Sequence, residues 1–401
     1  MKILVLNCGS SSVKYQIFDM AREKSLARGL LERIGLEGSL LTHRPAGKDK
    51  LVREVEAPDH EKAIRYCLEA LTDPEYGVIR DFGEIQGVGH RVAHGGDFPG
   101  SVLLNADTKA RIAELVALAP LHNAPALRGI SACEVLLPGI PQAACFDTAF
   151  HQSIPDYAYT YSLPHELAAK HRIRRYGFHG TSHKYVALRA AALTGRPFEE
   201  LKIITCHLGN GSSIAAIKNG QSYDTSMGFT PLAGLTMGTR CGDLDPAVVT
   251  FLMEKEGYSP REMEDILNKR SGILGLSGVS SDFRDIETAM DDGNPRARLA
   301  WNVFVHGVRK YIGAYTAVLG GLDILVFTAG LGENSPRARE AICQGFEYLG
   351  LRIDPQKNDV RGEEREITAA GARVRTFVIP TNEELMIARD TRALIEGQKA
   401  R

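Results

Sequence analysis

The sequence predicts an α/β protein of two domains built on a duplicated core. The chain has 401 residues, which exceeds the usual size of one hydrophobic core, so two domains are expected. A short β-rich apolar run breaks into a Gly/Ser loop and returns as alternating apolar residues at two places, over 2–17 and again over 202–220. A strand, a tight glycine turn and a returning strand form a hairpin. Two such hairpins at matching places in two halves of the chain predict one fold used twice.

The loops of both hairpins suit phosphate oxygens. The first loop belongs to 7–14 (NCGSSSVK) and the second to 207–213 (HLGNGSS). A turn of Gly and Ser presents backbone N–H groups and hydroxyls with no bulky side chain in the way. The sequence contains no G-x-x-x-x-G-K-[ST], so the hairpins, and not a P-loop, are expected to hold a polyphosphate from both sides.

Composition and charge exclude several classes of protein. Hydrophobic residues make up 44% and charged residues 24% of the chain, as in soluble globular proteins, and the net charge of −1 argues against a nucleic-acid partner. The seven cysteines include no C-x-x-C pair, which indicates reduced cytosolic thiols. The apolar run before Asn7 is too short for a signal peptide, and the apolar helix expected over 301–319 contains charged residues. We therefore expect a cytoplasmic protein with no membrane partner.

In the first part of the chain, apolar spacing and turn residues predict the following order of elements. They are a hairpin over 1–20, mixed strand and loop to about 57, a helix over 59–72, a strand over 88–92, helices over 107–119 and 124–136 separated by 120–123 (PLHN), and a strand over 143–146.

In the second part, 153–164 is expected to be a hinge or interface loop, and the second half restarts near Tyr176. Helical spacing of apolar residues predicts a packed helix over 301–319. A strand over 324–328 is expected to run into a turn over 330–336, with Pro336 in the first turn of the next helix. The segment 381–384 (TNEE) fits a capping box that opens a last helix.

Five segments together resemble the acetate kinases, and more broadly the acetate/propionate/butyrate kinases of the actin-like ATPase superfamily. They are 7–14 (NCGSSSVK), 90–91 (HR), 207–213 (HLGNGSS), 237–240 (MGTR) and 327–334 (FTAGLGEN). The resemblance runs from end to end of the chain. It implies a duplicated actin-like ATPase (ribonuclease-H-like) fold with an active-site cleft between two domains. It places one domain at 1–150 plus 383–401, with the last helix packed back, and a nucleotide-binding domain with the dimer interface at 151–382.

The resemblance also implies an activity and its partners. The expected reaction is reversible, direct in-line transfer of the γ-phosphoryl group of ATP to the carboxylate of acetate, giving acetyl phosphate and ADP, with propionate as a further substrate. Mg²⁺ is the expected metal, with Mn²⁺ as a substitute, and the expected assembly is a homodimer.

The resemblance assigns roles to individual residues. The catalytic residues it implies are Arg91, Asp147, His179 and Arg240. For substrate binding it implies Arg91, Ala93, Leu121, Phe178 and Pro231, and for the metal Asn7 and Glu383. For nucleotide binding it implies Ser10, Ser12, Lys14, His207, Leu208, Gly209, Asn210, Gly211, Asp282, Phe283, Arg284, Gly330, Leu331, Gly332, Glu333 and Asn334.

The chemistry of these residue types agrees with phosphoryl transfer to a carboxylate. An Arg fork matches a phosphoryl group or a carboxylate through two parallel hydrogen bonds. A carboxylic acid with a pKa of roughly 4 to 5 is already ionised at pH 7, so no general base is needed. Asp147 is therefore expected to orient Arg91 or metal-bound water. Glu383 and Asn7 are expected to contact Mg²⁺ through waters, because Mg²⁺ dehydrates reluctantly.

One position departs from the pattern of the acetate kinases. They commonly carry Val where this chain has Ala93, and propionate-preferring relatives carry Ala, so we expect efficient use of propionate. A propionate-preferring kinase is the nearest alternative, and a butyrate-type kinase needs a larger pocket. Two others are a hydroxyl kinase of the same superfamily, with Asp147 as base, and an ATP-driven binding protein without kinase activity.

Overall fold

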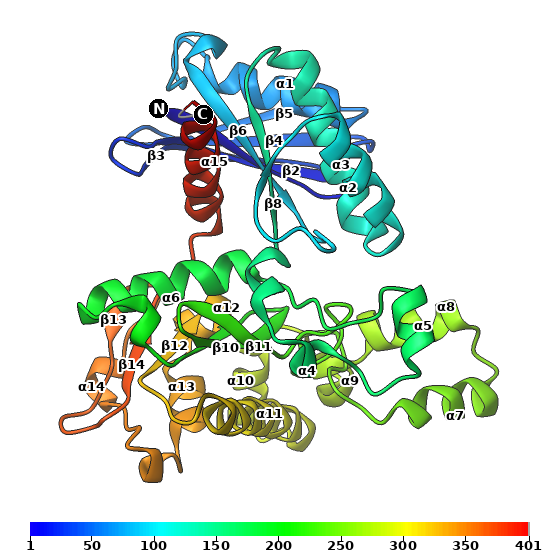
Figure 1. Ribbon diagram of the computed structural model, residues 1–401, viewed down its shortest axis with the longest axis vertical. Coiled ribbons are helices and arrows are strands. Elements are labelled where there is room, and N and C mark those ends of the chain that lie inside the picture. Colours follow the sequence, from blue (N-terminus) through cyan, green and yellow to red (C-terminus); the bar gives the residue numbers. More distant parts are fainter. Residues whose placement is uncertain (400–401) are drawn as a thin grey trace. The chain divides into compact units, whose positions relative to one another are not determined.

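The computed structural model describes residues 1–399. Their internal contacts divide the chain into two compact units (Figure 1). Unit 1 comprises Met1–Gln152 together with the segment that begins at Asn382, and unit 2 comprises Ser153–Thr381.

Unit 1 contains eight strands from the first part of the chain and also the last helix. Its strands are β1 (Lys2–Cys8), β2 (Ser12–Asp19), β3 (Lys24–Glu32), β4 (Ser39–Pro45), β5 (Leu51–Val55), β6 (Ile85–Val92), β7 (Val102–Leu103) and β8 (Gln142–Phe146). Its helices are α1 (His60–Leu71), η1 (Phe82–Glu84), α2 (Ala106–Glu114), η2 (Leu115–Ala117), α3 (Pro120–Leu136) and α15 (Glu383–Lys399), and η3 (Ala149–Ser153) ends its first segment.

The strands of unit 1 form one mixed sheet. Within residues 1–399, eight strands follow the order β5-β4-β3-β2-β1-β6-β8-β7. β1 pairs antiparallel with β2 and parallel with β6, and β6 pairs parallel with β8. The predicted first hairpin is confirmed as the β1–β2 pair.

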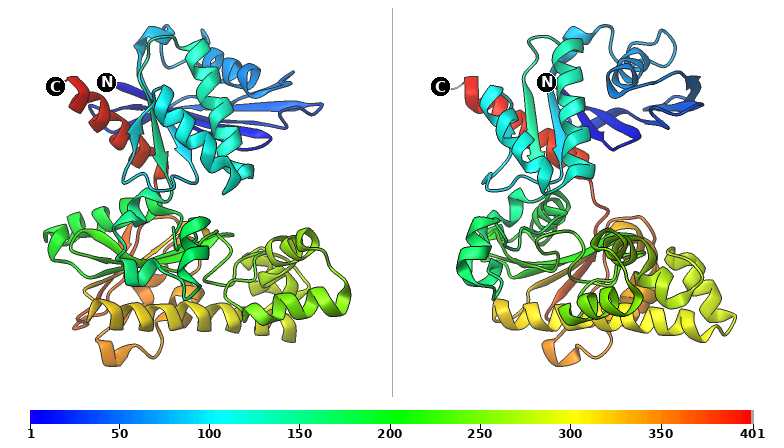
Figure 2. Two further views of the ribbon diagram at one scale, coloured as in Figure 1. Left: turned by 45° about the vertical axis from the view of Figure 1, so that its right-hand side comes forward. Right: turned by 90° about the vertical axis from the view of Figure 1, so that its right-hand side faces the viewer.

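Helices cover the two faces of this sheet (Figure 2). Successive residues of a strand point to opposite faces. Leu4, Leu6 and Val88 pack with residues of α1 and α3, whereas Gly87 and Gly89 face α15. A Cβ at Gly87 would lie 2.5 Å from Cδ1 of Ile395, and one at Gly89 would lie 2.6 Å from Cγ2 of Ile387. The glycines of β6 therefore allow the last helix to lie directly against the sheet.

Unit 2 contains the second sheet and most of the helices. Its strands are β9 (Ile203–Leu208), β10 (Ser212–Lys218), β11 (Gln221–Thr225), β12 (Ile324–Thr328), β13 (Arg365–Glu366) and β14 (Arg375–Val378). Its helices are α4 (Asp156–Tyr159), α5 (His165–Lys170), α6 (Gly180–Thr194), η4 (Phe198–Glu200), α7 (Pro246–Glu256), α8 (Pro260–Asp265), η5 (Ile266–Arg270), α9 (Gly272–Ser277), α10 (Phe283–Asp291), α11 (Pro295–Leu319), α12 (Ala329–Asn334), α13 (Pro336–Cys343), η6 (Glu347–Leu349) and α14 (Pro355–Asn358).

The second sheet repeats the order of the first. In the part of the chain that the structure describes, its six strands follow the order β11-β10-β9-β12-β14-β13. β9 pairs antiparallel with β10 and parallel with β12, and β12 pairs parallel with β14. The run β11-β10-β9-β12-β14 thus has the same order and strand directions as β3-β2-β1-β6-β8 of unit 1. This confirms the predicted α/β class and its duplicated fold.

A long helix supplies the core on one face of the second sheet. α11 carries Trp301, Phe304, Val308 and Ile312 on a buried stripe that packs with residues of β9, β10 and β12. α6 packs against β9 and β12. The predicted apolar helix is confirmed, and its apolar positions are buried in the core of unit 2.

The structure corrects three local predictions. α3 already begins at Pro120, so the segment 120–123 is not a separator, because proline fits the first helical position, where its missing N–H would be unpaired. Residues 329–334 form the short helix α12 and not a plain turn. Asn382, and not Thr381, caps the last helix, since its Oδ1 accepts from the backbone N–H of Leu385 at 3.0 Å.

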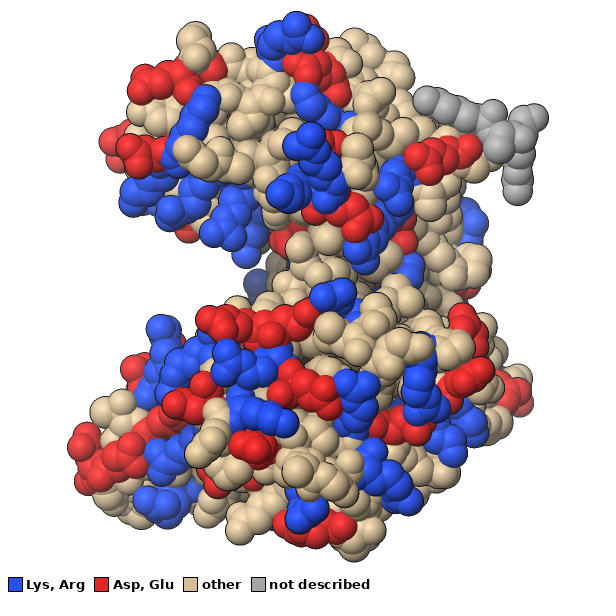
Figure 3. Space-filling model, turned by 90° about the vertical axis from the view of Figure 1, so that its left-hand side faces the viewer, with Lys and Arg blue, Asp and Glu red and all other residues tan. Residues whose placement is uncertain are grey.

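Two further observations concern the surface and the helices. Lys/Arg and Asp/Glu side chains are interspersed on the visible face of each unit (Figure 3), in agreement with the net charge of −1. Within residues 1–399, no helix combines the length and the apolar character needed to cross a bilayer.

Candidate active site

An ion pair stands where two parallel strands of unit 1 end. Arg91 lies near the end of β6, and Asp147 directly follows β8. Nε and Nη2 of Arg91 donate to Oδ1 and Oδ2 of Asp147 at 3.0 and 2.7 Å. Asp147 is 3% exposed, and its charge raises the pKa of the Arg91 guanidinium. Arg91 is therefore a permanently charged fork with a fixed orientation.

Glu383, the first residue of α15, shares the electrostatic environment of this pair. Burial raises the pKa of its carboxyl to about 7, against the opposing effect of the Arg91 charge. The charges of Asp147 and Glu384 also raise this pKa. A buried carboxylate beside other carboxylates favours a bound cation, which would relieve their repulsion.

The first hairpin places Asn7 and Lys14 opposite each other. They are Cα partners of β1 and β2, so their side chains share one face of the sheet. The backbone N–H of Gly9 donates to the carbonyl of Ser12 at 2.8 Å and closes the loop. Ser10 at the tip is exposed and Ser12 is half-buried, so hydroxyls and a lysine lie along one short loop.

The second hairpin loop holds the segment 237–240 beside it. The backbone N–H of Gly209 donates to the carbonyl of Gly211 at 3.2 Å, and that of Gly238 donates to the carbonyl of Asn210 at 2.9 Å. A Cβ at Gly238 would lie 1.8 Å from Oδ1 of Asn210, so a larger residue there would displace this side chain. The Asn210 side chain is exposed at the tip of the loop.

A chain of polar side chains orients His179. This residue precedes α6 and has a left-handed φ of 55°. Its Nδ1 is 2.9 Å from Oγ of Ser213, which is 2.8 Å from Nε2 of His183. Nδ1 of His183 is 2.7 Å from Oγ1 of Thr205, and the His179 ring stacks on His207 with centroids 4.1 Å apart. The ring of His179 is therefore held at one nitrogen and on one face.

Arg240 lies beside His179 at the second hairpin loop. A Cβ at Gly211 would be 3.5 Å from Nη1 of Arg240 and 3.5 Å from Cε1 of His179. Nη1 of Arg240 donates to the carbonyl of Pro231 at 3.3 Å. Phe178 is buried and forms a small apolar cluster with Met227 and Met237. Unit 2 thus brings five of the predicted residues to one place, namely Phe178, His179, Gly211, Pro231 and Arg240.

A cavity of about 710 Å³ in unit 2 is lined by the remaining segments that were predicted to bind the nucleotide. Its lining combines the tip of the second hairpin, the start of α10, and α12. The residues that line it are Gly209, Asn210, Ser281, Asp282, Phe283, Arg284, Glu287, Gly330, Leu331, Asn334, Ser335 and Arg361. Glycines at its wall allow a flat ligand to approach the backbone.

Some predicted residues lie outside this cavity lining. The Glu333 carboxylate accepts from the backbone N–H of Ala329 at 2.7 Å and of Thr381 at 3.1 Å, so it fastens the loop. The other predicted nucleotide-binding residues that do not line the cavity are His207, Leu208, Gly211 and Gly332 of unit 2 and Ser10, Ser12 and Lys14 of unit 1. Asp282 and Arg284, which do line it, pair with each other.

Ala93 and Leu121, two of the residues of unit 1 predicted to bind the substrate, lie on two segments joined by reciprocal hydrogen bonds. The backbone N–H of His94 donates to Oδ1 of Asn123 at 3.0 Å, and Nδ2 of Asn123 donates to the carbonyl of His94 at 2.9 Å. Ala93 precedes the first partner and is half-buried. Leu121, on the first turn of α3, is 69% exposed.

Sequence reasoning missed the residues that support these groups. Arg339 is fully buried, and it donates to the Gly332 carbonyl at 2.9 Å, to Oδ1 of Asn358 at 2.8 Å and to the Val360 carbonyl at 2.8 Å. Ser213 is part of the second hairpin motif, 207–213, and this position in the motif could have identified it as a site residue. Arg339 carries no local signal, because its partners, backbone carbonyls and the Asn358 side chain, are brought near by the fold.

The predicted metal contacts fit a magnesium ion that the nucleotide brings with it. Among residues 1–399, no group of three or more His, Cys, Asp or Glu side chains is arranged to hold a metal. Asn7 and Glu383 offer one amide oxygen and one carboxylate. Mg²⁺ is usually bound in this way by one or two protein oxygens, several waters and substrate phosphates.

Comparison with known proteins identifies the family of this chain. Residues 2–389 match the model of the Acetokinase family. The chain is 76% identical to the acetate kinase of Moorella thermoacetica over 99% of this chain and 100% of that protein. It superposes on the crystal structure of the Porphyromonas gingivalis acetate kinase with a TM-score of 0.95 and 48% identity, over 98% of this chain and 99% of that one. For a propionate kinase from Francisella tularensis the TM-score is 0.91 and the identity 42%, over 98% and 99%. The chain therefore belongs to the Acetokinase family.

Proposed function

We infer that this protein is an acetate kinase, which transfers the γ-phosphoryl group of ATP reversibly to the carboxylate of acetate. The observation that carries the proposal best is the cavity of about 710 Å³ formed by the second hairpin, the start of α10 and α12. Its volume lies in the range of small-molecule sites, roughly 300–1,000 Å³. The whole-chain similarity to acetate kinases supports acetate as the acceptor.

The nucleotide is proposed to bind with its base and ribose in this cavity. Gly330 and Leu331 would border the base, and Asn210 would donate to the phosphates from the loop tip. Ser10, Ser12 and Lys14 of the first hairpin supply hydroxyls and a positive charge of the kind that phosphates need. Mg²⁺, held by Asn7 and Glu383 through water, would neutralise phosphate charge during transfer.

The acceptor carboxylate requires orientation and charge compensation. One of its oxygens attacks the γ-phosphorus, the bond from that phosphorus to the β–γ bridging oxygen breaks, and ADP leaves with the electron pair. Arg91 matches a carboxylate or phosphoryl group through its fork, and Asp147 fixes that fork. Because the acceptor is already ionised, Asp147 acts as a positioning residue and not as a base.

His179 and Arg240 are proposed to stabilise the moving phosphoryl group. Such a transfer is catalysed mainly by positioned donors and positive charge. Both side chains flank Gly211 of the second hairpin loop, and Ser213 holds the His179 ring through Nδ1. Nε2 of His179 and the guanidinium of Arg240 are then the donors for phosphoryl oxygens.

We propose that the protein also uses propionate, forms a homodimer and works in the cytoplasm. Ala93 leaves more room than the Val of typical acetate kinases, which supports propionate. Exposed Phe251 and Leu299 of unit 2 supply apolar surface for self-association, which light scattering tests directly. Dependence on ATP and seven cysteines without disulfides support the cytoplasm.

Trapping of acyl phosphate with hydroxylamine tests the activity. The protein is incubated with Mg·ATP and, in separate reactions, acetate, propionate, butyrate or glycerol. Hydroxamate from acetate and propionate supports the proposal. ADP release with glycerol alone, and no hydroxamate from any acid, would assign the protein to the hydroxyl kinases and make Asp147 a base.

A further inference from the structure

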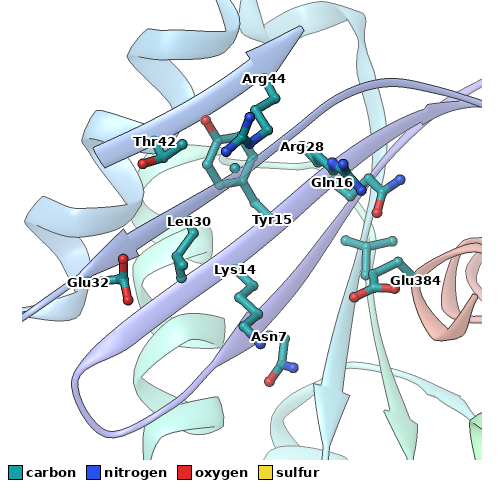
Figure 4. Close-up of a pocket in the computed structure, with 12 residues that line it drawn as sticks. Asn7, Lys14, Tyr15, Gln16, Arg28, Leu30, Glu32, Thr42, Arg44 and Glu384 are labelled. Carbon is teal, nitrogen blue, oxygen red and sulfur yellow. The ribbon is translucent and has the colours of Figure 1, made fainter. Parts of the chain in front are cut away.

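A second cavity, of about 430 Å³, lies in unit 1 over β2, β3 and β4 (Figure 4). Two rows of cross-strand neighbours form its floor. One row is Gln16, Arg28 and Arg44, and the next is Lys14, Leu30 and Thr42. Five of these six side chains can donate a hydrogen bond.

The two arginines are unusual because they face each other. Arg28 and Arg44 are Cα partners of β3 and β4, so they project from the same face with Cβ atoms about 5 Å apart. Like charges directly opposite each other destabilise a sheet. The stability of the sheet therefore does not explain this pair.

Neither arginine is neutralised by the protein. Within residues 1–399, neither the Arg28 nor the Arg44 guanidinium has a hydrogen-bond or ion-pair partner, and both residues are exposed. Other arginines of unit 1 do have carboxylate partners, such as Arg53 with Asp73 and Arg389 with Glu23. The facing pair is thus available to an external anion.

Glu32, one of the two acidic residues that line the cavity, lies away from the arginine row. Glu32 is on the same face of β3 as Arg28 but four residues further, which is about 13 Å along a strand. Glu384 belongs to the first turn of α15. Figure 4 shows Gln16 next to Arg28, with Glu32 on the far side of Leu30. The arginine row is thus separated from Glu32, whereas Figure 4 draws Glu384 on the Gln16 side of the cavity.

We propose that Arg28, Arg44 and Gln16 form a binding subsite for a small polyanion with two phosphate or carboxylate groups, and that Lys14 and Thr42 complete it. Each guanidinium fork can hold one anionic group through two hydrogen bonds. Cross-strand spacing of about 4.8 Å suits adjacent groups of one diphosphate or dicarboxylate.

One consequence rests on the proposed function. Lys14 lines this cavity and is also assigned to the phosphates of ATP. A polyanion at the arginine row will draw the Lys14 ammonium toward it, so occupancy weakens the binding of Mg·ATP. The subsite is in this way a candidate regulatory site for the kinase.

Calorimetry on the full chain tests the subsite without relying on activity. Pyrophosphate and succinate are titrated separately, in buffer without Mg²⁺, into the wild type, the double variant Arg28→Gln/Arg44→Gln and Arg22→Gln. Arg22 is an exposed arginine of the same unit outside the cavity lining. At least tenfold weaker binding to the double variant is expected, with wild-type affinity in the Arg22 variant. The melting temperature of the double variant should equal or exceed that of the wild type, because the facing charges are removed.

The two titrants distinguish the sources of the anion. Binding of pyrophosphate alone indicates a phosphorylated ligand, and binding of succinate alone indicates a carboxylate. Equal affinity in the wild type and the folded double variant, or no binding by the wild type at millimolar titrant, overturns the subsite.

A kinetic measurement then tests the coupling. The titrant that binds should raise the KM for ATP in the wild type and leave it unchanged in the double variant. An unchanged KM in the wild type, with arginine-dependent binding, overturns the regulatory role alone. Absence of any kinase activity would contradict the proposed function and leave the calorimetric result intact.

Discussion

Arg91 and Asp147 meet through two parallel hydrogen bonds, Nε to Oδ1 at 3.0 Å and Nη2 to Oδ2 at 2.7 Å, at the ends of β6 and β8. Because Asp147 is almost fully buried, its carboxylate serves this one partner. The pairing gives Asp147 a role in orienting Arg91 that requires no proton transfer.

Replacing Asp147 by Asn should lower kcat/KM for acetate by about 10- to 100-fold. Loss of one charged hydrogen bond of about 1.5–3 kcal/mol frees the Arg91 fork. Steady-state kinetics between pH 6 and 9 should show kcat/KM reduced by the same factor at every pH. Asp97→Asn, at the exposed Arg111–Asp97 pair, is the matched control and should leave kcat/KM unchanged. A loss that vanishes at high pH would indicate that Asp147 is a base.

Replacing Ser213 by Ala should reduce kcat roughly tenfold with little change in the KM for ATP. The variant leaves Nδ1 of His179 without its hydroxyl partner, so the ring is no longer held for Nε2 to donate. Ser226→Ala removes a buried hydroxyl that accepts from the backbone N–H of Ile214, and it should lower stability without lowering kcat. An unchanged kcat in Ser213→Ala would contradict the role of Ser213.

Replacing Arg339 by Lys should raise the KM for ATP and leave the KM for acetate unchanged. One ammonium cannot serve the carbonyls of Gly332 and Val360 and the side chain of Asn358 together, so α12 loosens. Each buried group left unpaired costs about 1–3 kcal/mol, so the melting temperature also falls. Affinity for ADP measured well below that temperature separates the two effects. Arg373→Lys, whose guanidinium donates to the exposed Leu349 carbonyl, is the control. Equal loss of acetate and ATP affinity would indicate a general defect.

His90 should make the protein less stable in acid. Its ring is buried and bonded to Oε1 of Gln142 at 2.7 Å, and burial lowers its pKa to about 4. Below its unfolded pKa of about 6.5, the unfolded state binds a proton that the folded state does not. Stability is therefore complete above about pH 6.5 and is lost as the pH falls towards 4, by about 3 kcal/mol.

Urea unfolding of the wild type and His90→Gln at several pH values measures this contribution. The variant should show a flatter decline of the unfolding free energy between pH 6.5 and 4. His171→Gln, at an exposed position, should decline like the wild type. Parallel curves for the wild type and His90→Gln would contradict the prediction.

Replacing Ala93 by Val should lower the ratio of kcat/KM for propionate to that for acetate. Two added methyl carbons take the room of about one substrate methylene, worth about 1–3 kcal/mol, or roughly 10- to 100-fold. Initial rates with both acids in the wild type and Ala93→Val measure the ratio. No change in the ratio would show that Ala93 does not set acid preference.

The predictable parts of the fold are those that local chemistry decides. Gly/Ser turns between apolar strands predicted both hairpins, and helical spacing from Trp301 predicted the buried stripe of α11. The prediction of two domains with limits at 150 and 383 stays a prediction. Pro120 was misread, because a proline ends one helix or begins the next with the same local sequence.

The site is harder to predict because its supports come from distant parts of the chain. The loop motifs pointed to segments that the structure places around one cavity, such as 282–284 and 330–334. The partners of Arg339 are carbonyls, which any residue could provide, and the Arg28–Arg44 pair depends on strand register. The roles assigned to individual catalytic side chains stay predictions for the experiments above.

The packing of α15 on β6 has a consequence for biosynthesis. Gly87 and Gly89 leave a surface that Ile387, Thr391 and Ile395 of α15 fill, and these residues leave the ribosome more than two hundred residues later. At translation rates of about 5–20 residues per second, α15 is synthesised on the order of ten to fifty seconds after the first segment of unit 1. Unit 2 can form its own core during that interval. Unit 1, whose synthesis begins first, therefore completes its fold last. Nascent chains stalled before residue 387 should therefore engage chaperones through the open side of β6.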